Sequence, residues 1–274
     1  MKKTLIIFGY FILICIAFSM LFPFFAMVNL ALTNESEIFK NSSIFLNFNL
    51  TFENFKHVFE ELPITRYFLN SLIVALITTL GQVLLSSLAG YSFARFNFKH
   101  KNFWFLIILI SMMVPPQVNI IPLFFVMREL HLIDTYTALI LPGLFGGFGV
   151  FLMRQFFLSL PKDLEEAAKI DGCNLLQTFF KISLPLALPA VVTLSIFTFV
   201  TTWNSFMWPL IVTNSETMRT LPVGLAIFKG SFREITLWGD LLACSVICTI
   251  PVIIIFLLGK KYFLSDLLCG AVKE

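Results

Sequence analysis

The sequence predicts an all-α integral membrane protein with six transmembrane helices and one short cytoplasmic helix between the fourth and the fifth. Of its 274 residues, 58% are hydrophobic and only 13% are charged, and a soluble domain of this size could not bury so much apolar surface in one core. Six runs contain no charged residue and no histidine, and each reaches the roughly 20 residues that a helix needs to cross a bilayer. These runs are Thr4–Asn34, Tyr67–Ala94, Asn102–Met127, Thr135–Met153, Ile182–Ser215 and Leu241–Gly259.

The first run follows Lys2 and Lys3, as the apolar region of a secretory signal peptide would. The apolar stretch is far longer than such a region, and no small-residue cleavage site ends it. We therefore expect an uncleaved first transmembrane helix.

Lysine and arginine are unevenly distributed between the two sides of the predicted bundle. Twelve of the 19 lie near the termini, after the second run and after the fourth run, whereas seven lie in the remaining loops. By the positive-inside rule, both termini and the 154–181 loop lie in the cytoplasm.

The second, third and fourth runs carry features of a closely packed bundle. Small residues spaced four apart permit close helix crossings, and prolines in the third run must interrupt its backbone hydrogen bonding. The small pairs are Ser86 with Gly90 and Gly143 with Gly147, and the prolines are Pro115, Pro116 and Pro122.

The cytoplasmic loop after the fourth run predicts a helix of about two turns. Asp163 can serve as its N-cap with Glu166 at the third helical position, and Gly172 can end it with a positive φ. The adjacent Ala167 and Ala168 would let another protein approach the backbone closely. Helix physics alone leaves two interpretations open, a docking segment for a partner or an amphipathic connector on the membrane surface.

The fifth run carries a polar arc, which we interpret as one wall of a transport path. Neutral hydrogen-bonding groups beside an aromatic ring suit a sugar, because its hydroxyls need partners and its ring faces stack. The alternative is that the hydroxyls bond carbonyls of their own helix or hold neighbouring helices together. On a helical wheel one stripe holds Thr201, Asn204 and Trp208, and the next holds Ser195, Thr198, Thr202 and Ser205. The path residues that we predict are Thr198, Thr201, Asn204, Ser205 and Trp208.

Several classes of function lose support from what the sequence lacks. The six runs hold no ionisable group of the kind that proton- and sodium-driven carriers place at mid-membrane. The chain has no Gly-x-x-x-x-Gly-Lys-Ser/Thr segment, so ATP-driven work would fall to another chain. Cys244 and Cys248 lie one helical turn apart without a third ligand and are interpreted as packing residues. We expect no catalytic, metal or cofactor site and no binding of nucleic acid.

The spacing across the cytoplasmic loop resembles a known signature. Glu166-Ala167-Ala168, three residues, Gly172, nine residues, Ile182, one residue and Leu184-Pro185 match the signature of binding-protein-dependent ABC importer permeases at every position. Over nearly its whole length the chain resembles the second, MalG-like permease of the maltose-type sugar importers. The matching segments are Asn70-Ser71, Ala89–Phe96, Ile121–Leu123, Leu132–Thr135, Trp203-Asn204, Pro209-Leu210, Leu221–Leu225 and Gly270–Lys273. The chain departs from the family at His131, where glycine is usual, and at Gly259, Asp266 and Glu274.

The resemblance implies a single permease domain over 1–274, with core helices over 67–265 that include a coupling loop at 154–183. It implies a subunit of the bacterial or archaeal inner membrane that pairs with a homologous permease, an ATPase dimer and an extracytoplasmic solute-binding protein to import a sugar. ATP and Mg²⁺ would bind the ATPase, so this chain would not be an enzyme. The alternatives are a permease of the same superfamily for a polyamine or an amino acid, and an ATP-independent channel or membrane enzyme. The residues that the resemblance assigns to ATPase coupling are Glu166, Ala167, Ala168, Asp171, Gly172, Leu184 and Pro185.

Overall fold

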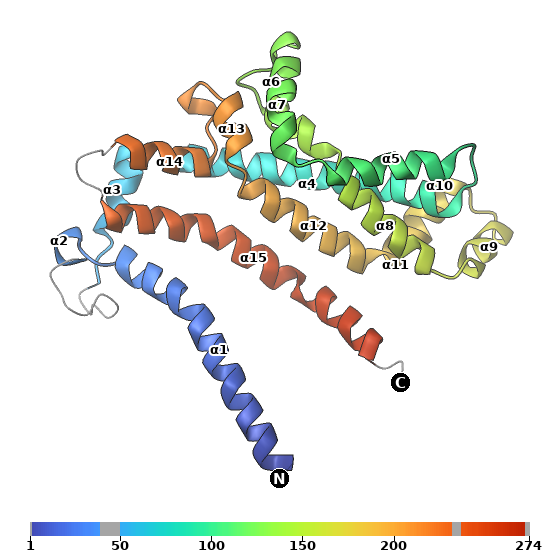
Figure 1. The fold of residues 1–274 in the computed structure, drawn as a ribbon, viewed down its shortest axis with the longest axis horizontal. Coiled ribbons are helices and arrows are strands. Elements are labelled where there is room, and N and C mark those ends of the chain that lie inside the picture. The colour runs from blue at the N-terminus through green and yellow to red at the C-terminus, as the bar shows by residue number, and fades with distance from the viewer. Residues whose placement is uncertain (1, 39–49, 232–236, 272–274) are drawn as a thin grey trace. The chain divides into compact units, whose positions relative to one another are not determined.

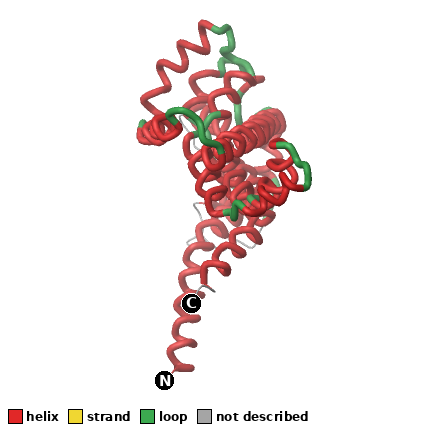
Figure 2. Tube along the Cα trace, turned by 90° about the vertical axis from the view of Figure 1, so that its right-hand side faces the viewer, coloured by secondary structure: helices red, strands yellow, loops and turns green. Residues whose placement is uncertain are grey.

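The computed structural model describes residues 2–38, 50–231 and 237–271, and Glu274 of the tail lies outside them. Within these ranges the regular structure is helical, apart from one isolated bridge between Thr33 and Leu50. Figure 2 shows helices joined by short loops and no strand in the described part of the chain. The predicted all-α class is confirmed.

The chain forms two compact units, which are described separately. Unit 1 holds residues 1–66 and 221–251, and unit 2 holds residues 67–220 and 252–274. Two long helices run from one unit into the other, α4 (Ile64–Arg95) and α15 (Trp238–Ala271). The other helices of unit 1 are α1 (Lys2–Ala31), α2 (Glu35–Ile38), α3 (Glu53–Glu61) and α14 (Leu221–Ser231).

Unit 1 is fastened by polar contacts between segments far apart in the sequence. The buried amide of Asn54 donates to the carbonyl oxygens of Ala31 and Thr33 at 2.9 and 2.7 Å. Gly239 leaves room for this amide, because a Cβ at that position would lie 2.5 Å from Asn54 Nδ2. The carboxylate of Glu35 accepts the backbone N–H of Gly239 at 2.7 Å, so the start of α15 is tied to α2.

Unit 2 holds the remaining helices, and Figure 1 shows α4, α5, α8 and α12 running beside one another. Gly90 on α4 permits its close crossing with α8, because a Cβ there would lie 2.7 Å from Met153 Cβ. The elements after α4 are α5 (Lys101–Met113), η1 (Pro116–Asn119), α6 (Ile120–Glu129), α7 (Tyr136–Ile140), η2 (Leu141–Leu144), α8 (Gly147–Ser159), α9 (Asp163–Ile170), α10 (Leu175–Thr178), the π-helical turn η3 (Phe179–Ser183), α11 (Leu184–Leu186), α12 (Leu188–Trp203), α13 (Met207–Val212) and η4 (Glu216–Met218).

The core of unit 2 near the 154–181 loop is an aromatic cluster around Tyr91. The ring of Tyr91 lies 5.3 Å from that of Phe157 on α8 and 5.1 Å from that of Phe179 in η3. Met153 and Leu194 complete the contact with α8 and α12. Aromatic pairs at these distances add about 0.5–1.5 kcal/mol each beyond their buried area, so the cluster fixes where the loop begins and ends.

Three helices are each long and apolar enough to cross a membrane, namely Ile6–Ala31, Ile64–Arg95 and Trp238–Lys261. Three further pairs of helices meet the same test only when each pair is taken as one broken span. Length and composition of the described residues therefore allow from three to six spans. The pairs are Lys101–Met113 with Pro116–Glu129, bent by 94°, Tyr136–Leu144 with Gly147–Ser159, bent by 41°, and Leu175–Leu186 with Leu188–Trp203, bent by 77°.

The third, fourth and fifth runs are therefore broken helices. This corrects the prediction that each run forms one continuous transmembrane helix. The third breaks where Pro115 and Pro116 lack the N–H groups that would continue α5. The predicted interruption at Pro122 is wrong. Pro122 is the third residue of α6, where backbone N–H groups have no partner within the helix.

Candidate functional site

The short helix predicted in the loop after the fourth run is present as α9, and Gly172 ends it as expected. Gly172 has a φ of 82°, in the left-handed region that glycine adopts without strain. Its N–H donates to the carbonyl of Lys169 at 3.1 Å, and the N–H of Cys173 donates to that of Ala168 at 2.9 Å. This pair of bonds is a Schellman motif, which satisfies two of the free carbonyls at the end of the helix.

The predicted capping box at the start of α9 is wrong. Lys162 is the N-cap and its side chain makes no capping hydrogen bond, whereas Asp163 is already the first helical residue. Asp163, Glu165 and Glu166 still place three carboxylates in the first turn, where they interact favourably with the helix dipole. The capping box in this loop belongs to α10, where Asn174 and Gln177 exchange side chain to backbone bonds of 2.8 and 2.9 Å.

A buried ion pair attaches α9 to the end of α4. Arg95 Nε lies 2.8 Å from Glu165 Oε1, and the two side chains are only 5% and 14% exposed. The hydroxyl of Ser183 donates to the same carboxylate at 3.2 Å, and Arg95 also donates to the carbonyl of Leu160 at 2.9 Å. Glu166 but not Glu165 belongs to the predicted coupling set, because nothing local to the loop shows which of two adjacent carboxylates meets an arginine 70 residues away.

The residues assigned to coupling divide between the surface and the interior of unit 2. Ala168 is buried and Leu184 packs at the edge of the cluster around Tyr91, so these two hold the loop in place. The side chain of Ile170 is 86% exposed, which is unusual for an isoleucine at the end of a well-fixed helix. The exposed members of the predicted set are Glu166, Ala167, Asp171, Gly172 and Pro185.

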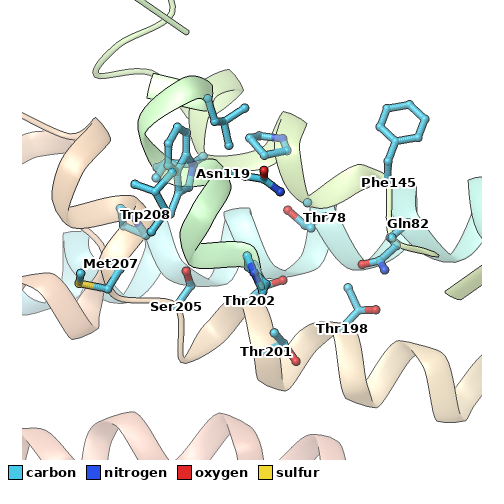
Figure 3. Close-up of a pocket in the computed structure, with 18 of the residues that line it drawn as sticks. Thr78, Gln82, Asn119, Phe145, Thr198, Thr201, Thr202, Ser205, Met207 and Trp208 are labelled. Atoms are coloured by element: carbon cyan, nitrogen blue, oxygen red, sulfur yellow. The ribbon is translucent and has the colours of Figure 1, made fainter. Parts of the chain in front are cut away.

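A cavity of about 1010 Å³ lies in unit 2, between α4, η1, the start of α8, α12 and α13. Thr198, Thr201, Ser205 and Trp208 of the predicted arc line it, and so does Thr202. Figure 3 shows the threonines of α12 facing the same space as Thr78 and Gln82 of α4. None of the described residues that line the cavity is charged.

Asn204 of the predicted path does not line the cavity. It is the C-cap of α12, its N–H still donates to the carbonyl of Val200 at 3.1 Å, and its side chain is exposed outside the cavity wall. Ser195 agrees with the alternative that hydroxyls of the arc bond carbonyls of their own helix, since its hydroxyl donates to the carbonyl of Val191 at 2.7 Å. The indole N–H of Trp208 donates to the carbonyl of Ala138 at 2.9 Å, so its hydrogen-bonding capacity is already used.

Seven polar residues of the cavity wall lie outside the predicted arc, namely Ser71, Thr78, Gln82, Ser111, Gln117, Asn119 and Thr220. Thr78 and Gln82 lie one turn apart on α4, and with Ser71 they form a polar stripe that the spacing within the second run could have revealed. Asn119 lies at the break between α5 and α6 and Thr220 lies in a loop, so neither belongs to a helical pattern. Their position could not be read from periodicity.

A network of hydrogen bonds holds the loop that carries Thr220. Asn70 Nδ2 donates to the carbonyls of Thr217 and Arg219 at 2.9 and 2.8 Å, and its Oδ1 accepts the hydroxyl of Tyr136 at 2.6 Å. Burial opposes ionisation of Asp134, but hydrogen bonds from Ser215 and Asn214 outweigh it and hold the pKa of its carboxyl below the ordinary value of 3.8. Thr220 is therefore placed by a fixed loop.

Comparison with known proteins identifies the relatives of the chain. A family model described as "Binding-protein-dependent transport system inner membrane component" matches residues 82–264. The arabinooligosaccharides transport system permease protein AraQ of Halalkalibacterium halodurans is 38% identical, over 94% of this chain and 93% of that protein. The trehalose/maltose transport system permease protein MalG of Thermococcus litoralis is 36% identical, over 100% and 98%. The sn-glycerol-3-phosphate transport system permease protein UgpE of Yersinia pestis is 30% identical, over 97% of each chain.

The fold is also that of a solved structure. A chain of a bacterial ABC transporter involved in the import of the acidic polysaccharide alginate superposes with a TM-score of 0.85. The match covers 96% of this chain and 97% of that one at 23% sequence identity. This likeness concerns the fold alone.

Proposed function

The chain belongs to the family of binding-protein-dependent transport system inner membrane components, and from this premise we propose that it is the permease subunit of an ATP-driven importer for a sugar or an oligosaccharide. Relatives named as arabinooligosaccharide and trehalose/maltose permeases, matched over more than nine-tenths of this chain, support the sugar. These comparisons confirm the predicted resemblance to binding-protein-dependent ABC importer permeases, which rested on the signature of the cytoplasmic loop and on the matching segments.

The geometry of α9 is the observation that carries the coupling part of the proposal. The ion pair between Arg95 and Glu165 holds the inner side of the helix, and the Schellman motif at Gly172 fixes its end. Glu166 and Ala167 remain exposed on the other side, where a cleft of a separate ATPase would meet them. A helix held in this way moves as a rigid body when its partner moves.

The path of the movement follows from the same contacts. Displacement of α9 pulls on Arg95, the last residue of α4, and α4 carries Thr78 and Gln82 in the cavity wall several turns away. Closure of the ATPase dimer would thereby change the cavity and open it to one side of the membrane at a time. In this arrangement a homologous permease supplies the other half of the path, and an extracytoplasmic solute-binding protein delivers the sugar.

Transport driven by ATP is tested with the complete complex in liposomes. We expect uptake of labelled arabinotriose or maltotriose to require ATP on the cytoplasmic side and to persist when a protonophore collapses the proton gradient, because the candidate path carries no ionisable relay. Liposomes loaded with a non-hydrolysable ATP analogue are the control. Loss of uptake with the protonophore at unchanged ATP would contradict the proposal.

A further inference from the structure

We infer that unit 2 carries a binding site for the head group of an anionic phospholipid, formed by Lys101 on α5, Arg154 on α8 and Lys162 at the start of α9. The chemistry of the site is a phosphate held by several cations, and its apolar surroundings assign that phosphate to a lipid rather than to a soluble ion. None of the three residues lines the cavity described above. The inference goes beyond the proposed function, because binding of a lipid does not depend on which solute is transported.

Three positive charges from different segments come together at this site without a counter-charge. The charges of Arg154 and Lys162 both act on Lys101, and no carboxylate of the described residues offsets them there. Within the same residues none of the three side chains forms an ion pair, and Glu165, three residues after Lys162, is already engaged with Arg95. Figure 1 shows the start of α5, the end of α8 and α9 at the same end of unit 2. Repulsion between unpaired cations costs free energy, which an anionic ligand between them would remove.

The two cations on the helices are held in place before any ligand binds. Lys101 Nζ donates to the carbonyl of Phe96 at 2.8 Å, and Arg154 Nε donates to that of Phe93 at 3.4 Å. The guanidinium of Arg154 also lies 4.0 Å from the centre of the Phe105 ring, which shares one face of α5 with Lys101. These contacts leave the other N–H groups of the ammonium and the guanidinium for a ligand. Side chains that are already ordered lose less entropy on binding.

The surroundings of the cations are those of a membrane interface. A candidate broken span begins at Lys101, and its first turns expose Phe103, Trp104 and Leu106 by 57%, 52% and 51%. Trp104 follows Lys101 by three residues, so the two side chains are neighbours on the surface of α5. Tryptophan and basic residues gather at the level of the lipid head groups, and the positive-inside rule predicts that this end of the bundle faces the negatively charged cytoplasmic surface of the membrane. A phospholipid satisfies both features, because its phosphate meets the cations and its acyl chains cover the rings.

A lipid bound at this site would fasten the start of α9 to the rest of unit 2. Lys162 is the N-cap of α9, and its carbonyl accepts the N–H groups of Glu165 and Glu166 at 2.9 and 3.1 Å. A phosphate that contacts both Lys162 and Arg154 links this turn to α8. The carboxylate of Asp163 is exposed, so water screens its repulsion of the phosphate. We therefore expect anionic lipid to strengthen coupling through α9, and this one consequence rests on the proposed function.

Binding is tested with the purified permease and ATPase complex, freed of endogenous lipid in a neutral detergent. The probes are phosphatidylglycerol and phosphatidylcholine with the same acyl chains at equal concentrations, and bound lipid is measured by native mass spectrometry. We expect phosphatidylglycerol to bind more tightly than phosphatidylcholine, and an excess of inorganic phosphate to leave it bound. Full displacement by inorganic phosphate would show a site for a soluble anion and overturn the assignment to a lipid.

Variants show whether these three cations form the site. Arg154→Gln and Lys162→Gln should each weaken binding of phosphatidylglycerol about fivefold, the effect of one basic residue at a charged membrane surface, and leave phosphatidylcholine unaffected. The side chain of Lys162 is exposed and makes no capping bond, so its replacement does not disturb the fold. Lys101→Arg keeps the charge and should retain binding. Lys99→Gln is the matched control, because it removes one exposed positive charge from the same loop that does not act on Lys101.

The outcomes separate this inference from the proposed function. Equal affinity of the wild-type complex for the two lipids, or wild-type affinity in both glutamine variants, would overturn the inference even if ATP-driven sugar uptake persists. Preferential binding that the glutamine variants weaken, in a complex that takes up no sugar with ATP, would instead uphold the inference and refute the proposed function.

The consequence for coupling has its own measurement. ATP hydrolysis stimulated by the solute-binding protein is compared in vesicles of phosphatidylcholine alone and in vesicles that also contain phosphatidylglycerol. We expect phosphatidylglycerol to raise the stimulation of the wild-type complex, and to raise it less in Lys162→Gln than in Lys99→Gln. Equal stimulation of the wild type in both kinds of vesicle would overturn the link between the lipid and α9.

Discussion

The residues after α6 and α9 adopt the same backbone conformation, although only one of them is glycine. Gly172 follows α9 with a φ of 82°, and His131 follows α6 with a φ of 54°. The N–H of His131 donates to the carbonyl of Arg128 at 3.0 Å, and that of Leu132 to the carbonyl of Met127 at 2.9 Å, as in a Schellman motif. The left-handed conformation costs a residue with a Cβ about 1–2 kcal/mol. His131 is therefore strained at a position where the resembled family usually has glycine.

Replacing His131 by glycine should stabilise the protein. The gain in free energy of unfolding should be up to about 1 kcal/mol, because relief of strain is partly offset by the greater freedom of glycine in the unfolded chain. The thermal midpoint of the purified complex measures it. His131→Ala keeps the Cβ and should give no such gain. A lower midpoint for the glycine variant than for the wild type would show that the imidazole makes contacts that outweigh the strain.

Adjacent carboxylates in α9 have opposite environments, which sequence reasoning could not assign. Glu165 is largely buried against Arg95, with 14% of its side chain exposed, whereas Glu166 is exposed. The helical pattern of the loop placed both in the first turn correctly, but it does not show which side of the helix faces the bundle. That depends on contacts between segments 70 residues apart, which a local pattern does not contain.

At the scale of elements, sequence patterns predicted where helices occur better than how they end and bend. Gly172 adopts the positive φ that ends α9, and Pro115 and Pro116 lack the N–H groups that would continue α5. Both helices end where these residues predict. The N-cap of α9 was misplaced by one residue, since Lys162 rather than Asp163 occupies it. The break of 77° between α11 and α12 falls at Ala187, two residues before Pro189, which has no N–H to continue α11 and lies in the first turn of α12, a local signal that the prediction of one continuous fifth run did not use.

The polar arc shows the same limit. Thr198 and Thr201 lie on one continuous helix, and both line the cavity. Asn204, the C-cap of the same helix, does not line the cavity. Trp208 lines the cavity as predicted, but it does so from a different helix, α13, to which the helical wheel of the fifth run does not apply. The role of these residues in transport remains a prediction.

The attachment of α9 to α4 leads to a prediction about both elements. Glu165→Gln leaves Arg95 buried without a counter-charge and should lower the free energy of unfolding by about 3–5 kcal/mol, as loss of one partner of a buried ion pair does. Glu166→Gln, at the exposed neighbouring position, should change it by less than about 0.5 kcal/mol. Thermal unfolding of the two variants, together with the rate of tryptic cleavage after Lys169, provides the comparison. Equal stability of the two variants would show that other contacts hold α9.

At the scale of the whole molecule, the composition predicted a membrane protein whose path lacks ionisable groups, and the described part of unit 2 agrees with that. The described residues that line the cavity offer no relay for ion coupling, which supports the proposal that energy enters from a separate ATPase. The exposed side of α9 is the place where we propose that it enters.

Coupling through α9 is the central claim, and Gly172 tests it most directly. Gly172→Val puts a β-branched side chain at a φ of 82° and should disrupt the end of α9, whereas Gly172→Asn tolerates that conformation. Apart from its two chain neighbours, no heavy atom of the described residues lies within 4 Å of a Cβ built at this position, so the two variants differ mainly in backbone strain. The measurement is ATP hydrolysis stimulated by the solute-binding protein in the reconstituted complex, with co-purification of the ATPase. We predict loss of most of the stimulation in Gly172→Val and near wild-type stimulation in Gly172→Asn. Wild-type association and stimulation in Gly172→Val would contradict the account and make α9 a simple connector.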